Sequence, residues 1–412
     1  MKRRQFLQWG AGLALGSLTG TRALALSSRP VSVVVVGGGI VGASIAYHLA
    51  RRGAQVTLLE KSQFASGASG KSFAWINANF TKQPREYHAL SKLGVLGWHT
   101  LREQIGAALP VRFDGTLEWY VNSQRADEMT RLVRQQQGWG YPVELMPLEG
   151  IARREPMLQP GKALATAFSP LEGAVDSALA TRLLLDEAVK AGATVRQNCA
   201  VEGILLRGAG DGRVSDDVVV RSTRDEFTAD HVVLAGGVDT AALGALAGVK
   251  VPLKSSPGVV VRSKPMPPLV RGVMATEDSH FHQQADGRVL MGDDYTPPAK
   301  VELHRLLEQH PTDFPLPEIA AKHGVRIRGQ AARHLPALAD AEVESVSLCW
   351  RPMPQDEYPI IGFAPGSSQI YVTVTHSGVT LAPIIGELAA IELLDGVKVD
   401  LLAPYRLERF KT

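Results

Sequence analysis

The globular part of the chain begins with two apolar segments separated by an amphipathic one. Residues 31–36 form a run of β-branched residues, which is typical of a buried parallel strand. In residues 43–50 alanine and leucine recur with helical spacing, and residues 55–59 are again apolar enough for a strand. The pattern predicts a strand–helix–strand unit whose two strands lie in one parallel sheet.

Later patterns predict a second sheet and a long helix near residue 390. Aromatic or β-branched segments bounded by Gly or Asp indicate strands at 116–121, 258–263 and 288–294. Proline-flanked patterns indicate short helices at 302–309 and 318–323. Residues 380–394 have the apolar spacing of a longer helix, with Pro383 in its first turn and Gly396 just beyond its end.

A glycine pattern follows the first predicted strand directly. Gly37-x-Gly39-x-x-Gly42 leads into the helix, and Glu60 ends the second strand 21 residues after Gly39. Gly37 permits a tight turn, Gly39 lets the backbone approach a pyrophosphate, and Gly42 lets the helix pack close to the strand. Helix amides would bind the phosphates, and Glu60 would accept hydrogen bonds from ribose hydroxyls. The unit predicts a dinucleotide site without separating NAD from FAD.

The first 25 residues have the pattern of an export signal. A basic start is followed by an apolar stretch at 6–18 and by an A-x-A cleavage sequence at 23–25. The pair Arg3 and Arg4 resembles the twin-arginine signal of bacteria. We therefore expect a periplasmic protein that is exported folded, and an uncleaved N-terminal anchor is the alternative.

The net charge of +3 originates in this N-terminal segment. The segment holds four of the 44 basic residues and no acidic one, so 40 basic residues remain against 41 acidic ones. This balance gives no reason to expect a nucleic-acid partner. Beyond residue 26 no apolar run reaches 18 residues, so we expect no membrane span in the mature chain. The two cysteines, Cys199 and Cys349, have no spacing that favours a disulfide.

Four stretches resemble the flavin-dependent amine and amino-acid oxidase family, which includes D-amino-acid, glycine and sarcosine oxidases. Three resemble segments around the adenosine and pyrophosphate: "EKSQFASGASGKSFAWIN" at 60–77, "EGAVDSALATRLLLDEAVKAGATVRQNCAVEGI" at 172–204 and "ADHVVLAGGVDTAALGALAG" at 229–248. The most specific is "CWRPMPQDEYPIIGFAPGSSQIYVTVTHSGVTLAPIIGELAAIELLDG" at 349–396. In the family this last helix points its N-terminus at the flavin pyrimidine carbonyl, where oriented amides stabilise the negative charge of the reduced ring.

The resemblance implies an α/β fold with a discontinuous Rossmann-type FAD-binding domain and an inserted α+β substrate domain on a mainly antiparallel sheet. The FAD-binding domain would comprise 30–110, 165–250 and 345–412, and the substrate domain 111–164 and 251–344. FAD would be held without a covalent bond. The residues expected to contact it are Gly37, Gly39, Ile40, Val41, Gly42, Glu60, Lys61, Ser69, Gly70, Val201, Gly236, Gly362, Gly378, Val379 and Thr380.

Two residues are candidates for catalysis. Arg351 matches the arginine of the family's Arg-Pro segment, which binds the substrate carboxylate in D-amino-acid and glycine oxidases, and its planar fork suits that task. A structural ion pair with Asp356 or Glu357 is the alternative. His376 precedes the Gly378 turn and would accept a proton from a substrate ammonium, unless it only bonds backbone groups.

Other residues have weaker claims to a chemical role. His280 and His282 share a strand face, but no third metal ligand is suitably spaced, so we expect solvated or pocket-rim histidines. Cys349 aligns with the flavin-linked cysteine of sarcosine oxidases, which makes a covalent link the alternative to ordinary packing. Lys71 is a phosphate contact or a surface lysine. Core or pocket lining is expected for the aromatic residues Trp75, Trp119, Tyr120 and Trp350.

Together these features predict an exported FAD-dependent oxidoreductase that oxidises the C–N bond of a small amino acid or amine to an imine. Hydride would pass to the flavin, and oxygen, a quinone or a carrier would then take the electrons. A 2-hydroxy-acid oxidase with the same arginine is a second interpretation. A non-catalytic FAD-binding subunit of a dehydrogenase assembly is a third.

Overall fold

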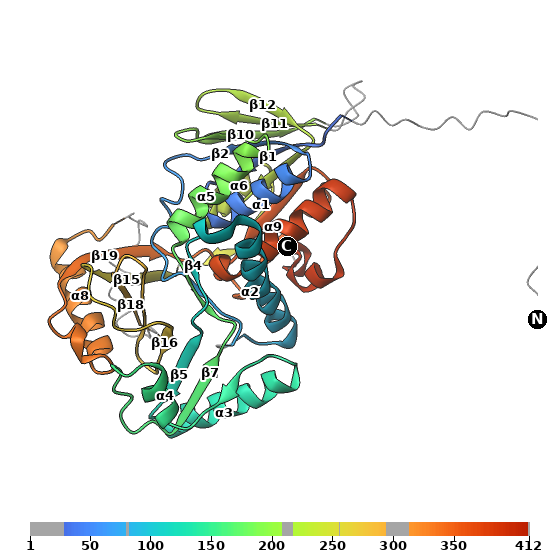
Figure 1. Ribbon diagram of the computed structural model, residues 1–412. Helices are drawn as coiled ribbons and strands as arrows, with labels where there is room; N and C mark the ends of the chain where they lie inside the picture. The colour runs from blue at the N-terminus through green and yellow to red at the C-terminus, as the bar shows by residue number, and fades with distance from the viewer. Residues whose placement is uncertain (1–28, 80–81, 208–216, 255, 294–312, 411–412) are drawn as a thin grey trace, which may run out of the picture.

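The computed structural model describes residues 29–79, 82–207, 217–254, 256–293 and 313–410 (Figure 1). The predicted export signal and the predicted helix at 302–309 lie outside these residues. Figure 1 shows two halves, with the sheet β10–β12 at one end of the molecule and the helices α3 and α8 at the other.

A six-stranded sheet forms the centre of the nucleotide-binding half, in the order β21-β22-β13-β1-β2-β9. All neighbours are parallel except the edge strand β21, which is antiparallel to β22. The strands are β1 (Ser32–Val36), β2 (Gln55–Leu59), β9 (Thr194–Arg196), β13 (His231–Leu234), β21 (Ile360–Phe363) and β22 (Ile370–Val374). Every residue of β1 is buried, as its continuous apolar run predicts.

The two faces of this sheet are covered differently. On one face α1 (Ile40–Arg51) packs against both α5 (Ser177–Lys190) and α9 (Gly378–Asp395), and α2 (Arg85–Ile105) packs on α9. On the other face lies an antiparallel sheet of β10 (Val201–Leu206), β11 (Val218–Ser222) and β12 (Glu226–Ala229). Alternate residues of β1 therefore enter two separate cores, with Val33 in the helical one and Val34 in the other.

The second half is built on an eight-stranded sheet in the order β19-β15-β18-β17-β16-β5-β7-β6. Its pairs are antiparallel except β16 with β5, so the expectation of a mainly antiparallel substrate domain is confirmed. The strands are β5 (Thr116–Tyr120), β6 (Glu144–Leu145), β7 (Ala165–Ser169), β15 (Pro257–Ser263), β16 (Val273–Ala275), β17 (His280–Gln283), β18 (Val289–Gly292) and β19 (Val343–Trp350). This sheet contains all three strands that the sequence predicts here.

The predicted domain boundaries at 165 and 345 need correction. β7 pairs with β5, and β19 pairs with β15 along its whole length. Residues 165–169 and 345–350 therefore belong to the substrate sheet and not to the FAD-binding domain. The remaining short elements are β3 (Trp75–Ile76), β4 (Val111–Arg112), β8 (Gly173–Val175), β14 (Leu253–Lys254), β20 (Met353–Pro354), α3 (Ser123–Gly138), α4 (Glu149–Arg154) and α6 (Thr240–Leu246).

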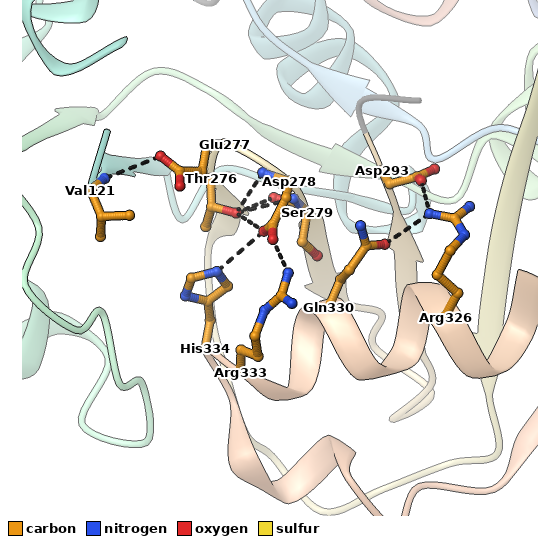
Figure 2. Close-up of polar contacts among 10 residues, drawn as sticks. All are labelled: Val121, Thr276, Glu277, Asp278, Ser279, Asp293, Arg326, Gln330, Arg333 and His334. Carbon is orange, nitrogen blue, oxygen red and sulfur yellow. Dashed lines mark hydrogen bonds and ion pairs between the residues drawn. The ribbon is translucent and has the colours of Figure 1, made fainter. Parts of the chain in front are cut away.

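The helix predicted at 318–323 is longer than expected and runs as α8 from Pro317 to Ala332. It passes through Gly324, where a Cβ would lie only 3.0 Å from Val346 on β19, so the glycine permits close packing on the sheet. Figure 2 shows two ion pairs that link α8 to loops of the substrate sheet. Arg326 pairs with Asp293 after β18, and Arg333, just after α8, pairs with Asp278 between β16 and β17. None of the described helices is both long and apolar enough to cross a membrane.

Candidate cofactor and active site

A cavity of about 760 Å³ lies where the carboxyl ends of β1, β2, β13 and β22 meet β19 and the start of α9. This volume falls in the upper part of the ~300–1,000 Å³ range of ligand and cofactor sites. Predicted site residues from distant parts of the sequence line this one cavity. They are Gly37, Gly39, Ile40, Val41, Glu60, Lys61, Ser69, Gly236, Arg351, His376, Gly378 and Val379.

Each glycine of the turn after β1 is required for a different structural reason. Gly37 has φ +118°, and a Cβ there would lie 2.4 Å from the carbonyl oxygen of Ala235. A Cβ at Gly42 would lie 2.0 Å from the carbonyl oxygen of Gly37, so Gly42 holds the helix against the turn and does not line the cavity. At Gly39, by contrast, the nearest atom to a Cβ is the Ser69 hydroxyl oxygen at 3.1 Å.

The N-terminus of α1 opens toward the cavity. Gly39 precedes the helix and supplies no side-chain cap, and the first turn contains no acidic residue. The amide of Ile40 donates a hydrogen bond to Ser69 Oγ at 2.9 Å, which brings the loop after β2 over this helix end. Free amides, a positive dipole end and a hydroxyl form an arrangement suited to a pyrophosphate.

Glu60 is held at the cavity wall by the backbone. Its Oε2 accepts a hydrogen bond from the Gly38 amide at 2.7 Å, and its Oε1 accepts one from the Ser62 amide at 2.8 Å. The next residue, Lys61, pairs with Asp239 at 2.8 Å, and both line the cavity. Because that pair is largely exposed, it contributes little to stability.

The helix α9 begins at Gly378, two residues earlier than predicted, which puts Pro383 in its second turn. Pro383 has no amide to donate to the carbonyl oxygen of Val379, four residues before it. The indole of Trp98 on α2 donates to that oxygen instead, at 2.8 Å. The helix therefore continues past the proline with its backbone satisfied.

Two glycines of α2 allow it to approach the start of α9. A Cβ at Gly94 would lie 2.4 Å from the carbonyl oxygen of Thr380, and a Cβ at Gly97 would lie 2.7 Å from the Pro383 ring. Thr380 itself is buried, and its Oγ1 donates to the carbonyl oxygen of Trp75 at 3.1 Å. Thr380 thus joins the helix to β3, and its role here is structural.

Three other predicted cofactor contacts are not among the described residues that line the cavity. They are Gly70, Val201 and Gly362. A Cβ at Gly70 would lie 2.3 Å from the Ala65 carbonyl oxygen, so this glycine shapes the loop. Val201 starts β10. Gly362 has φ +138° and lies against the buried guanidinium of Arg406, which pairs with Glu392.

Arg351 follows β19 directly, and its amide donates to the Ser256 carbonyl oxygen at 2.8 Å. The guanidinium crosses Gly258 of β15, where a Cβ would lie 2.9 Å from its Nε. A larger residue at 258 would therefore displace it. Gly258 is a contribution that the sequence interpretation missed, although a glycine that opens a β-branched strand signals close approach.

The alternative of an ion pair between Arg351 and Asp356 or Glu357 is wrong. Asp356 pairs with Arg409 at 2.6 Å, and Glu357 pairs with Lys254 at 2.6 Å. Among the residues that the structure describes, no carboxylate forms an ion pair with the Arg351 guanidinium. The cavity therefore contains a cation whose bidentate donors are available to an anionic ligand.

His376 lines the same cavity as Arg351. Solvent reaches the imidazole through the cavity, but the surrounding protein and the charges of Arg351 and Lys82 lower its pKa to about 3. The imidazole is therefore neutral at physiological pH and can accept a hydrogen bond. Its predicted role as acceptor of a substrate proton stays a prediction.

Cys349 also lines the cavity, and burial raises its pKa to about 11 even though Arg351 and Lys71 act in the opposite direction. The group is a thiol rather than a thiolate at physiological pH, which does not favour attack on a flavin. Lys71 is at the cavity as well and pairs with Asp313 at 3.2 Å. Both cysteines are free and buried.

His280 and His282, which we expect as solvated or pocket-rim histidines, do not line the cavity and instead pack against an aromatic ring. Their rings pack edge-on against Phe73 at centroid distances of 4.4 and 4.8 Å, and His282 Nε2 lies 2.9 Å from the Phe73 carbonyl oxygen. Burial lowers the pKa of each imidazole to about 4. Within the described parts of the chain, no three His, Cys, Asp or Glu side chains gather in an arrangement that could hold a metal ion.

The aromatic residues divide between pocket and core. Trp350 lines the cavity, whereas Trp119 is buried in the substrate domain. Trp75 donates through its indole to Thr116 Oγ1 at 3.0 Å, and the Tyr120 hydroxyl donates to Glu118 at 3.0 Å. These roles agree with core or pocket lining.

Comparison with known proteins identifies the family. A model described as "FAD dependent oxidoreductase" matches residues 32–391. The chain belongs to this family. Glycine oxidase of Geobacillus kaustophilus is 27% identical to this oxidoreductase over 387 residues, which are 92% of this chain and 96% of that protein. A crystal structure of glycine oxidase from that organism superimposes with a TM-score of 0.79 at 25% identity, covering 92% of this chain and 99% of the other.

Two further proteins extend the comparison. The 4-methylaminobutanoate oxidase (formaldehyde-forming) of Paenarthrobacter nicotinovorans is 29% identical over 89% of this chain, although the match spans only 44% of that protein. The L-proline dehydrogenase of P. horikoshii shares the fold, with a TM-score of 0.76 at 22% identity over 92% of this chain and 98% of the other. The predicted family, fold class and FAD dependence are confirmed.

The residues of the cavity fit FAD. Gly39, Ile40 and Ser69 would hold the pyrophosphate, and Glu60 would hold the adenosine ribose. Near the start of α9, the buried hydroxyls of Thr373 and Thr375 have no partner within the described residues, and both residues line the cavity. The start of α9 supplies oriented amides to the flavin end, and Arg351 and His376 lie beside it.

Proposed function

We propose that this oxidoreductase oxidises the C–N bond of a small amino acid or amine. FAD, when bound, accepts the hydride that leaves the carbon next to nitrogen. The substrate becomes an imine, which water hydrolyses to a carbonyl compound and an amine or ammonia. The names of the relatives, glycine oxidase and 4-methylaminobutanoate oxidase, support a substrate of this class.

The observation that carries the proposal is the guanidinium of Arg351 at the cavity wall, without a carboxylate partner among the described residues. A bidentate hold on a substrate carboxylate would fix the substrate at one end and limit how its reacting carbon can lie. The neutral His376 beside it can accept a hydrogen bond from a substrate N–H. We assign Arg351 the binding role and His376 an orienting role.

A substrate panel tests the proposal directly. The purified holoenzyme is mixed without oxygen with D- and L-amino acids, N-methyl amino acids, simple amines and 2-hydroxy acids, and the flavin absorbance is followed. We expect bleaching with at least one amino acid or amine that carries a carboxylate. Bleaching by hydroxy acids alone, or by no member of the panel, would contradict the proposal. Reoxidation by oxygen or by a quinone then identifies the electron acceptor.

We further propose that the protein is exported folded by the twin-arginine route. Arg3 and Arg4 and the A-x-A sequence at 23–25 support this. A non-covalent cofactor that is loaded before export is compatible with a route that carries folded proteins. Replacing both arginines with lysine should leave active holoenzyme in the cytoplasm, and a periplasmic fraction as active as that of the unmodified protein would refute this route.

A further inference from the structure

Lys82 is a buried cation behind the first turn of α9. Its side chain is 9% exposed, and its Nζ donates a hydrogen bond to Ser377 Oγ at 2.8 Å. The same Nζ lies 5.1 Å from the centre of the Tyr87 ring, whose hydroxyl is 2.8 Å from Ser377 Oγ. In the described part of the chain, no carboxylate forms an ion pair with Lys82.

A buried ammonium without a counter-ion needs a physical explanation. Moving such a charge out of water is unfavourable unless other groups compensate. The Ser377 hydroxyl and the face of the Tyr87 ring offset part of this cost. An uncharged side chain of similar length would fill the same space without the cost of burying a charge. The position therefore suggests an anion that is present only during the reaction.

Lys82 does not line the cofactor cavity, but its positive charge acts on residues that do. Ser377, its hydrogen-bond partner, directly precedes Gly378, the first residue of α9, and Gly378 and Val379 line the cavity. The Ser377 side chain makes no capping bond to the helix, so the first amides of α9 stay available to a ligand. Lys82 also lowers the pKa of His376, which lines the cavity.

We propose that Lys82 is a positioning residue that raises the reduction potential of bound FAD by adding a positive charge behind the N-terminus of α9. In the reaction a substrate C–H bond breaks, and its hydrogen leaves with both electrons for the flavin. The substrate is oxidised and the ring gains one negative charge. Lys82 stabilises that charged form and does little for the neutral oxidised ring. The inference rests on FAD binding and is independent of the substrate proposed above.

The test compares holoenzyme variants that differ in charge at this position. Lys82→Gln keeps a donor for Ser377 but removes the charge, Lys82→Met removes both, and Lys82→Arg keeps the charge. Lys92→Gln is the control for loss of a lysine charge, because Lys92 is nearby in the sequence but donates to the Gly140 carbonyl oxygen and not to a residue at the start of α9. The midpoint potential of the flavin is measured, together with the dissociation constant of sulfite, which adds to oxidised flavin and leaves the ring negatively charged.

We expect sulfite to bind about tenfold more weakly to the neutral Lys82 variants. The flavin potential should fall by about 30 mV, which is a tenfold change for a two-electron couple. Lys82→Arg and Lys92→Gln should remain close to the unmodified enzyme. Ser377→Ala, which retains the charge, should also keep most of the potential.

Three outcomes would overturn the proposal. One is an unchanged potential and sulfite affinity in whichever neutral Lys82 variant retains FAD. A second is an equal loss in Ser377→Ala, which would assign the effect to the hydroxyl. The third is a raised substrate KM at unchanged potential, which would make Lys82 a substrate contact. Because potential and sulfite binding need no substrate, failure of this inference is distinguishable from failure of the proposed function.

Discussion

The hydroxyl of Ser69 accepts a hydrogen bond from the amide of Ile40 at 2.9 Å, at the first residue of α1. The loop after β2 thus places a hydroxyl oxygen at the N-terminus of α1, and this helix end would face the pyrophosphate. This loop lies next to the point where Gly39 leaves the cavity open. The hydroxyl can turn from the amide to a phosphate oxygen when FAD binds, since it can donate as well as accept.

Ser69→Ala should therefore weaken FAD binding by about tenfold, the effect of losing one hydrogen bond to a charged group. The measurement is titration of apoprotein with FAD, followed by flavin fluorescence. Ser66→Ala is the control, because Ser66 also lines the cavity but is exposed. Equal FAD affinities of the two variants would show that Ser69 does not bind the phosphates.

Alanine at Gly39 and at Gly42 should have different consequences. A Cβ at Gly42 would overlap the Gly37 carbonyl oxygen at 2.0 Å, so Gly42→Ala should lower the Tm of the apoprotein by several degrees. A Cβ at Gly39 meets only the movable Ser69 hydroxyl, so Gly39→Ala should fold normally and lose FAD affinity. Thermal unfolding without FAD and FAD titration separate the two effects. A destabilised Gly39→Ala apoprotein would count against this assignment.

Arg351→Ala should retain FAD and lose kcat/KM on the order of a hundredfold for a carboxylate substrate, because a charge-assisted bidentate contact is lost. Arg351→Lys should recover only part of the loss, since an ammonium cannot reproduce the fork. Arg288→Gln is the control, since Arg288 belongs to an exposed ion pair with Glu344. Steady-state kinetics with the best substrate of the panel provides the measurement. Full activity of Arg351→Ala would make this arginine structural.

FAD should be released from the native protein by acid precipitation, leaving a yellow supernatant and a colourless pellet. The reason is that burial keeps Cys349 a thiol, with a pKa of about 11. Cys349→Ser should behave in the same way. A yellow pellet from the native protein and a colourless one from Cys349→Ser would establish a covalent link at this residue instead.

The free energy of unfolding should fall as the pH drops from about 6.5 to about 4. His282 is buried with a folded-state pKa of about 4, whereas the unfolded chain takes up the proton near 6.5. Protons therefore bind preferentially to the unfolded chain in this window, at a cost of about 3 kcal/mol at most for this residue. His282→Gln, which keeps a donor for the Phe73 carbonyl oxygen, should lose less stability on acidification. Urea unfolding at pH 7.0 and 4.5 measures the difference, and equal losses would refute the role of His282.

The parts of the fold that could be predicted are those determined by interactions within a short stretch of sequence. The strand–helix–strand unit and its glycines need only residues 31–60, where apolar spacing and glycine positions act locally. The assignment of β19 could not be predicted, because it depends on pairing with β15, with Cys349 opposite Gly258. The strand pattern alone does not say which sheet it joins.

The same limit applies to the site. Resemblance predicts Arg351, and the position before the Gly378 turn predicts His376. Lys82 lies outside all four recognised stretches, 295 residues from its hydrogen-bond partner Ser377. The burial of His280 and His282 depends on Phe73, which comes from another part of the chain. Alternation along the strand predicts a shared face but not what covers it.

The lining of the cavity runs from Gly37 to Val379, with contributions from the loops after β1, β2, β13 and β22. During synthesis the ribosome makes the first wall more than 300 residues before the last one. A nascent chain that ends before α9 lacks the helix that packs on α1 and closes the flavin end. The complete lining of the FAD site therefore exists only after the chain has been synthesised through Val379 and α9 has packed on α1.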